Sequence, residues 1–130
     1  MRVRFSAFQI ERSHTGTAVA KVTLQYGGQT EIGTAAGPSS EVGDMRLSAE
    51  ASLRALMKLT GDHEFDLVGV KHIKAFDSNL AIVSLTHRTD GMSYPLVGCY
   101  LAKEDIFRGA AIAVLNATNR ILSVATQRMD

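Results

Sequence analysis

Hydrophobic and polar positions alternate in the first third of the chain, and this alternation predicts antiparallel strands. The clearest run has an apolar residue at every second position: Ala18, Ala20, Val22, Leu24 and Tyr26. A strand with one buried and one solvated face has this pattern. An earlier alternating segment changes phase near Ala7–Phe8, so we expect a β-bulge there. Gly27-Gly28 predicts a hairpin turn, followed by a return strand over residues 30–36.

A helical spacing follows these three strands. Apolar residues recur at every fourth position, at Leu47, Ala51, Ala55 and Leu59. This spacing predicts an amphipathic helix that is capped by Asp44 and stopped by Thr60-Gly61-Asp62. Glycine, proline and serine are abundant over residues 37–43, and they predict a loop before the helix.

The second half repeats this plan. Strands are predicted over 65–76, 80–88 and 94–101, with a turn at 77–79 and a helix from Glu104 or Asp105 to about Val124. The two helices align after a shift of about 62 positions, and the strand glycines Gly33 and Gly98 precede them, so we expect an internal duplication. The predicted fold is α+β: one domain, 1–130, of two pseudo-symmetric βββα units, 1–61 and 62–130, whose antiparallel sheets are covered by two helices. A ferredoxin-like sandwich is the alternative.

Composition and charge narrow the class of protein. The formal net charge is +1, and the basic residues are scattered, so we expect no nucleic-acid partner. No apolar run approaches the roughly 20 residues that a membrane helix needs, and the first residues do not resemble a signal peptide. The single cysteine cannot form an internal disulfide, so we expect a cytoplasmic location.

Candidate catalytic chemistry is sparse. The four histidines have no metal-binding spacing, and no nucleophile stands in a recognisable motif. Cys99 lies in a predicted strand and shares a face with Val97 and Leu101, which favours a buried, inert thiol. We therefore expect no enzymatic activity, no cofactor and no bound metal.

The strands of the second half carry apolar residues on both faces. One face is expected to hold Leu67, Ile73, Ala75, Ala81, Val83 and Leu85, and the other Val68, Val70, Phe76, Leu80 and Ile82. Helices would cover only one of these faces, and monomers rarely expose a large apolar patch. We expect a homodimer in which a two-fold partner covers the other face.

The residues around the second helix carry a family resemblance. They are the strand glycine Gly98, then Asp105-Ile106, Ala113 and Ala117 at helical spacing, and a closing Asn119-Arg120. This series resembles the C-terminal regulatory domain of 2-isopropylmalate synthase and of its citramalate synthase relatives, and the resemblance runs from about Thr17 to Leu122. It implies an amino-acid-sensing regulatory module that acts on a partner enzyme. The family's catalytic barrel has no counterpart in these 130 residues, so synthase activity is not implied.

A ligand site, if one exists, is expected where loops 37–44 and 99–105 approach each other. Helix N-termini favour carboxylates, and the corresponding loops hold the feedback amino acid in the similar synthase domains, so the expected ligand is a small apolar amino acid or 2-oxo acid. The candidate residues are Gly33, Gly37, Pro38, Gly98, Asp105, Ile106 and Gly109.

Each candidate also has a structural interpretation. The glycines would permit close packing of backbone, and Asp105 would cap its helix. The whole chain would then be a dimerisation or scaffold module without a ligand, in which side chains such as Tyr100 or Met45 fill the space between the loops.

Overall fold

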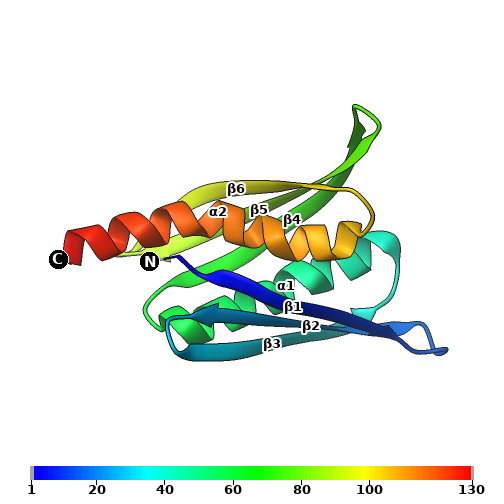
Figure 1. The fold of residues 1–130 in the computed structure, drawn as a ribbon, viewed down its shortest axis with the longest axis horizontal. Helices are drawn as coiled ribbons and strands as arrows, with labels where there is room; N and C mark the ends of the chain where they lie inside the picture. The colour runs from blue at the N-terminus through cyan, green and yellow to red at the C-terminus, as the bar shows by residue number, and fades with distance from the viewer. Residues whose placement is uncertain (1, 130) are drawn as a thin grey trace.

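The computed structural model describes the backbone of residues 2–129 and the side chains of residues 2–122. Three strands and a helix occur twice in succession (Figure 1). The elements are β1 (Arg4–Arg12), β2 (Thr17–Tyr26), β3 (Gln29–Pro38), α1 (Glu41–Thr60), β4 (Glu64–Ala75), β5 (Ser78–Thr89), β6 (Met92–Ala102) and α2 (Ile106–Met129). The strands form two separate antiparallel sheets, β1-β2-β3 and β4-β5-β6. The predicted α+β fold with repeated βββα units is confirmed, and the ferredoxin-like alternative, which has one sheet, is wrong.

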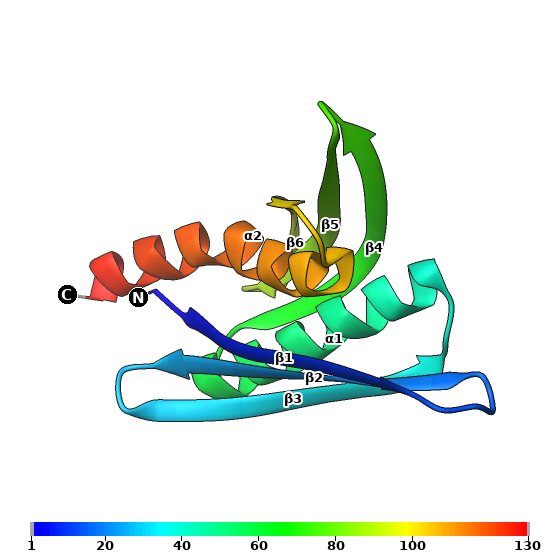
Figure 2. The same ribbon diagram turned by 45° about the vertical axis from the view of Figure 1, so that its right-hand side comes forward.

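The two helices pack against each other in the layer between the sheets (Figures 1 and 2). Helix α1 lies on β2 and β3, and α2 lies on β5 and β6. The core therefore joins the inner faces of both sheets to the small-residue sides of both helices. Its fully buried residues include Ala20, Val22, Leu24, Ala51, Ala55, Val83, Leu85 and Ala113. The outer face of each sheet is left without a helix.

Bulges set which residues face the core. In β1 the register shifts between Phe5 and Ala7, slightly before the expected position. A second shift, between Leu67 and Gly69 of β4, was not anticipated. The extra residue, Val68, reverses the inward and outward alternation beyond it. Val70 consequently pairs with the buried Val83 and packs against the core, so the expectation that Val70 lies on the uncovered face is wrong.

Helix α1 begins earlier than the sequence pattern predicted. Ser40, in extended conformation, is the N-cap, and its hydroxyl accepts a hydrogen bond of 2.9 Å from the backbone N–H of Gly43. Strand β3 continues to Pro38, so the loop expected over residues 37–43 shrinks to two residues. Asp44, the expected cap, lies inside the first turn of the helix. Gly61 ends the helix as predicted, with φ of 66° and its N–H donating to the Met57 carbonyl.

The turn between β4 and β5 lies one residue earlier than predicted. Ala75 pairs with Ser78, so Phe76 and Asp77 form the two-residue loop. The tip of this hairpin stands away from both helices (Figure 2). Over the residues that the structure describes, neither helix combines the length and apolar character needed to cross a membrane.

Candidate functional site

Gly33 and Gly98, both candidate ligand contacts, lie between a strand and a helix. A methyl group added at Gly33 would overlap the backbone of Ala51 and Ala55, and one at Gly98 would overlap Ala113 and Ala117. Both glycines are buried. Close packing of backbone therefore accounts for these two glycines, and no room is left for a ligand beside them.

Gly109 is also a packing position. A methyl group built on it would lie 2.9 Å from Cβ of Ala102, 3.5 Å from Cδ2 of Tyr100 and 3.6 Å from Cβ of Ala81. The first turn of α2 therefore lies directly against β5 and β6. This contact agrees with the structural interpretation of Gly109, and a ligand has no space there.

Asp105 caps α2. Its Oδ1 accepts hydrogen bonds from the backbone N–H groups of Phe107, at 3.0 Å, and Arg108, at 3.1 Å. These are the groups that a bound carboxylate would use, so the cap competes with an anionic ligand. Ile106 packs its side chain against the small buried cluster of Met45, Ala81 and Ala110.

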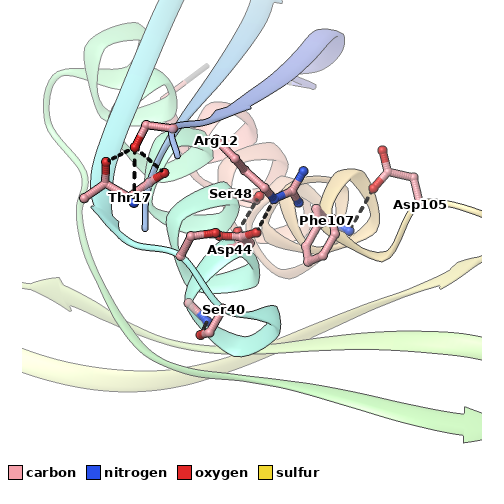
Figure 3. Close-up of polar contacts among 10 residues, drawn as sticks. Arg12, Thr17, Ser40, Asp44, Ser48, Asp105 and Phe107 are labelled. Atoms are coloured by element: carbon pink, nitrogen blue, oxygen red, sulfur yellow. Dashed lines mark hydrogen bonds and ion pairs between the residues drawn. The ribbon is translucent and has the colours of Figure 1, made fainter. Parts of the chain in front are cut away.

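Side chains occupy the space between the starts of the two helices (Figure 3). Nε of Arg12, at the end of β1, lies 2.7 Å from Oδ2 of Asp44 in the first turn of α1. The Arg12 guanidinium lies 5.0 Å from the centre of the Phe107 ring in the first turn of α2. The Ser39 hydroxyl donates to Oδ1 of Asp44 at 2.9 Å. We call these four residues the Arg12 junction.

Met45 is buried beside the Arg12 junction, in a cluster that Phe107 contacts. Its side chain is 1 % exposed, and Val70, Ile106 and Phe107 pack around the cluster to which it belongs. The scaffold interpretation expected Met45 in this filling role. Sequence reasoning missed Arg12 and Phe107, because a contact between residues so far apart in the chain leaves no local pattern.

The remaining candidates border shallow surface hollows. Gly37 and Pro38 line one of about 320 Å³, together with Leu47, Arg46 and Arg54. Asp105 lines another of about 400 Å³, with residues 100–104 and Arg108. The two hollows share no lining residue. The structure thus does not gather the candidate residues around one cavity.

Helix side chains bond to one edge strand of each sheet, β3 and β6. Arg54 and Lys58 of α1 donate to the carbonyls of Thr34 and Ile32 on β3, each at 2.6 Å. Asn116 of α2 donates to the Cys99 carbonyl on β6 at 2.8 Å. These bonds satisfy backbone groups that an edge strand would otherwise offer to another chain.

Asn119, from the Asn-Arg pair that contributes to the family resemblance, has a structural role. It accepts a hydrogen bond of 2.9 Å from the Val3 N–H and donates one of 3.3 Å to the Val3 carbonyl. The amide thus pairs with the start of the chain as a neighbouring strand would. The buried side chain of Val3 belongs to the core, so this pair of bonds holds the N-terminal segment on α2.

Two histidine contacts have opposite effects on protonation. Nδ1 of His72 lies 2.7 Å from Glu41, and its Nε2 lies 2.8 Å from the Asn79 side-chain oxygen. These hydrogen bonds, first to Asn79 and then to Glu41, raise the pKa of His72. His87 lies 3.2 Å from His63, and burial together with that neighbour lowers the pKa of His87. Among the described residues no group of three or more side chains could hold a metal ion.

The outer side of the β4-β5-β6 sheet is largely apolar over the half nearer the β4–β5 turn, while Asp66, Ser84 and Thr86 lie on its other half. We call this surface the open face. The β-strand pairings put these residues on it: Lys71, Ile73, Leu80, Ile82, Val97, Cys99 and Leu101. Val97 is 67 % exposed and Leu101 54 % exposed. Cys99 is exposed as well, so the expectation of a buried thiol is wrong. The helices cover the opposite face of β6, on which the close contact of Gly98 with α2 lies.

Comparison of the chain with protein-family models and with curated proteins finds no match in either case.

Proposed function

We propose that this chain is a non-catalytic dimerisation module and that the open face is its contact surface. A contrast between the outer faces of the two sheets supports the proposal. At the centre of the β1-β2-β3 sheet the outward row is Gln9, Lys21 and Thr34. In the other sheet the central outward row is Lys71, Ile82 and Cys99, and the next row is Ile73, Leu80 and Leu101.

The apolar open face gains free energy when another surface covers it. Each Å² of apolar surface removed from water contributes about 25 cal/mol. Contiguous apolar patches on a soluble domain commonly mark contact sites. The outer face of β1-β2-β3 offers a smaller gain, because its exposed apolar residues Val19 and Ile32 stand among polar side chains. Of the two outer faces, the open face is therefore the better suited to burial in an interface.

Charges along β4 favour a second copy of the chain as the partner. Glu64 and Asp66 lie at the start of this strand, where Arg88 of β5 forms ion pairs with both, and Lys71 lies towards its end on the same face. A two-fold axis that reverses the strands would stack β4 on β4 of the partner in the opposite direction. The start of each strand, which keeps one negative charge beyond Arg88, would then lie over Lys71 of the other copy, and this makes the surface complementary to itself.

The experiment compares two substitutions of the same charge on the two outer faces. Ile82→Glu puts a carboxylate at the centre of the open face, and Thr23→Glu puts one on the outer face of the other sheet's middle strand. We expect analytical ultracentrifugation at micromolar concentration to find a dimer for the wild type and for Thr23→Glu, and a monomer for Ile82→Glu. A dimer that tolerates Ile82→Glu would overturn the proposed contact surface.

A small-molecule regulatory role is the second candidate. The hollow beside Gly37 and Pro38 favours it, because Arg46 and Arg54, with the single carboxylate of Glu50, leave one net positive charge there and Leu47 supplies apolar surface. This combination fits a small amino acid or 2-oxo acid, and the bound module would act on a partner enzyme. The regulatory resemblance of the sequence points to the same class of ligand.

Thermal unfolding with a panel of amino acids and 2-oxo acids tests this second role. A ligand at 100 times its dissociation constant adds about 2.7 kcal/mol of stability. Binding in the hollow predicts that Arg46→Gln abolishes the shift while Arg120→Gln, an exposed change on α2, preserves it. A panel without any shift would remove the regulatory candidate and leave dimerisation standing.

A further inference from the structure

The tip of the β4–β5 hairpin carries an aromatic side chain in an unusual backbone conformation. Phe76 has φ of 52° and Asp77 has φ of 58°, so both loop residues lie in the left-handed region. The Phe76 side chain is 100 % exposed. The hairpin that presents it stands clear of the helices (Figure 2).

Neither the turn nor the fold requires phenylalanine at this position. Two-residue hairpin loops of this kind favour Asn-Gly or Asp-Gly, because these residues adopt positive φ at little cost. The chain uses such residues in its other tight hairpins, Gly27-Gly28 and Asp90-Gly91. In the described part of the chain, Phe76 is the one apolar residue with positive φ. Backbone strain held at an exposed position points to a use for the side chain outside the folded chain itself.

We propose that Phe76 is an anchor that packs against a second copy of this chain. This inference rests on the proposed dimer and specifies a contact within it. The hairpin tip and the open face belong to the same sheet. Exposed aromatic side chains that become buried on association supply much of the binding energy of interfaces.

The position of β5 between two turns indicates which part of the second copy would contact Phe76. Its two flanking turns, Phe76-Asp77 and Asp90-Gly91, adjoin the first and the last residue of the strand. A two-fold axis that lies between the two facing sheets, perpendicular to the strands and level with the middle of β5, therefore brings each tip over the other copy's Asp90-Gly91 end. A hollow of about 500 Å³ lies at that end, and Arg88 and Met92 line it together with the polar residues Asp62, Glu64, Thr89, Asp90 and Ser93. Guanidinium and thioether groups both make favourable contacts with aromatic rings.

Phe76→Asn separates the role of the side chain from the role of the turn. Asparagine tolerates positive φ better than phenylalanine, so the change relieves strain while it removes the ring. We expect the dimer dissociation constant to rise about tenfold or more, which is the size of an interface anchor's contribution. In the Ile82→Glu background, where dimerisation is blocked, the same change should raise the unfolding temperature.

Two control variants complete the design. Phe76→Tyr keeps an aromatic ring at the tip and should leave the dissociation constant nearly unchanged. Val42→Asn removes another exposed apolar side chain, 60 % exposed on α1, which lies on the opposite side of the sheet from the open face, and should also have no effect on association.

The outcomes distinguish this inference from the proposed function. A wild-type dimer whose dissociation constant is unchanged by Phe76→Asn would overturn the anchor and leave the dimer in place. A wild-type protein that stays monomeric would overturn both. Weakened association on Phe76→Asn, together with normal association of Phe76→Tyr and Val42→Asn, is the result that we expect.

Discussion

Gly33 and Gly98 occupy equivalent points of the two βββα units. Each lies on the third strand of its unit, against two alanines four residues apart on the helix of the same unit. The pairs are Ala51 and Ala55 in α1, and Ala113 and Ala117 in α2. Both helices therefore approach their sheets most closely at a glycine, which explains why the two copies share this residue.

Gly98→Ala should destabilise the protein. The added methyl group would overlap helix backbone, which cannot rotate away as a side chain could. Overpacking of this kind costs about 1–3 kcal/mol, and urea unfolding measures it. Gly28→Ala is the matched control, because a methyl group there meets no atom within 4 Å. Equal stability of the two variants would contradict the account of the close contact.

Arg12→Ala should also destabilise the fold, because it removes the cation beside a buried carboxylate. The side chain of Asp44 is 4 % exposed and that of Arg12 is 45 % exposed. The Ser39 hydrogen bond and the helix start still support Asp44, so we expect a loss of about 1–2 kcal/mol. Arg4→Ala, an exposed change on the same strand, should have little effect in the same unfolding assay. An Arg12→Ala variant with unchanged stability would mean that the Arg12 junction does not hold the helix starts together.

His72 should make part of the stability dependent on pH. Its pKa is raised from the usual 6.5 by its bonds to Asn79 and Glu41, so the folded state favours the protonated ring. This contribution is fully present below pH 6.5 and is lost as the pH rises through the raised pKa. The stability difference between wild type and His72→Phe should therefore be larger at pH 5.5 than at pH 8.5. A stability difference that does not change with pH would contradict the ion pair between His72 and Glu41.

His87 contributes a dependence of the opposite sign. Burial and the neighbouring His63 lower its pKa, so its share of the stability is lost as the pH falls. The two effects oppose each other in the wild-type protein. For this reason the test of His72 compares a variant with the wild type at each pH and does not rely on the pH profile of the wild type alone.

Val70→Glu should unfold or strongly destabilise the chain. The bulge at Val68 turns Val70 towards the helices, where it packs on both buried clusters. A carboxylate there would lose hydration without gaining a partner, at a cost of several kcal/mol. Val68→Glu is the control, because Val68 is 59 % exposed. Circular dichroism that shows Val70→Glu as stable as Val68→Glu would mean that the register is incorrect.

The sequence carried enough information to predict the repeated architecture. Period-two alternation in the strands and four-residue spacing in the helices are local patterns, and both reflect one-sided burial. The turn at Gly27-Gly28 and the end of α1 at Gly61 were also marked by local residues. The start of α1 was missed because Ser40 and Asp44 are both good caps, and the choice depends on how far β3 continues.

Less of the candidate site could be predicted from the sequence. Val68 is an extra residue in a run of apolar residues, so nothing in the pattern marked the change of phase that brings Val70 inward. The same difficulty left the open face wrongly assigned in part. Val70 was expected on it and Ile73 on the face of Val83, and the bulge exchanges these two positions. The Arg12 junction depends on three segments meeting in space, which local periodicity does not encode.

The mass of the wild-type protein in solution tests the central claim most directly. Sedimentation equilibrium over a range of micromolar concentrations should give twice the 14.0 kDa of one chain, with dissociation on dilution. This result would mean that a second copy covers the open face, as its apolar rows and the charges of β4 favour. A mass of one chain at all these concentrations would contradict the proposed dimerisation module.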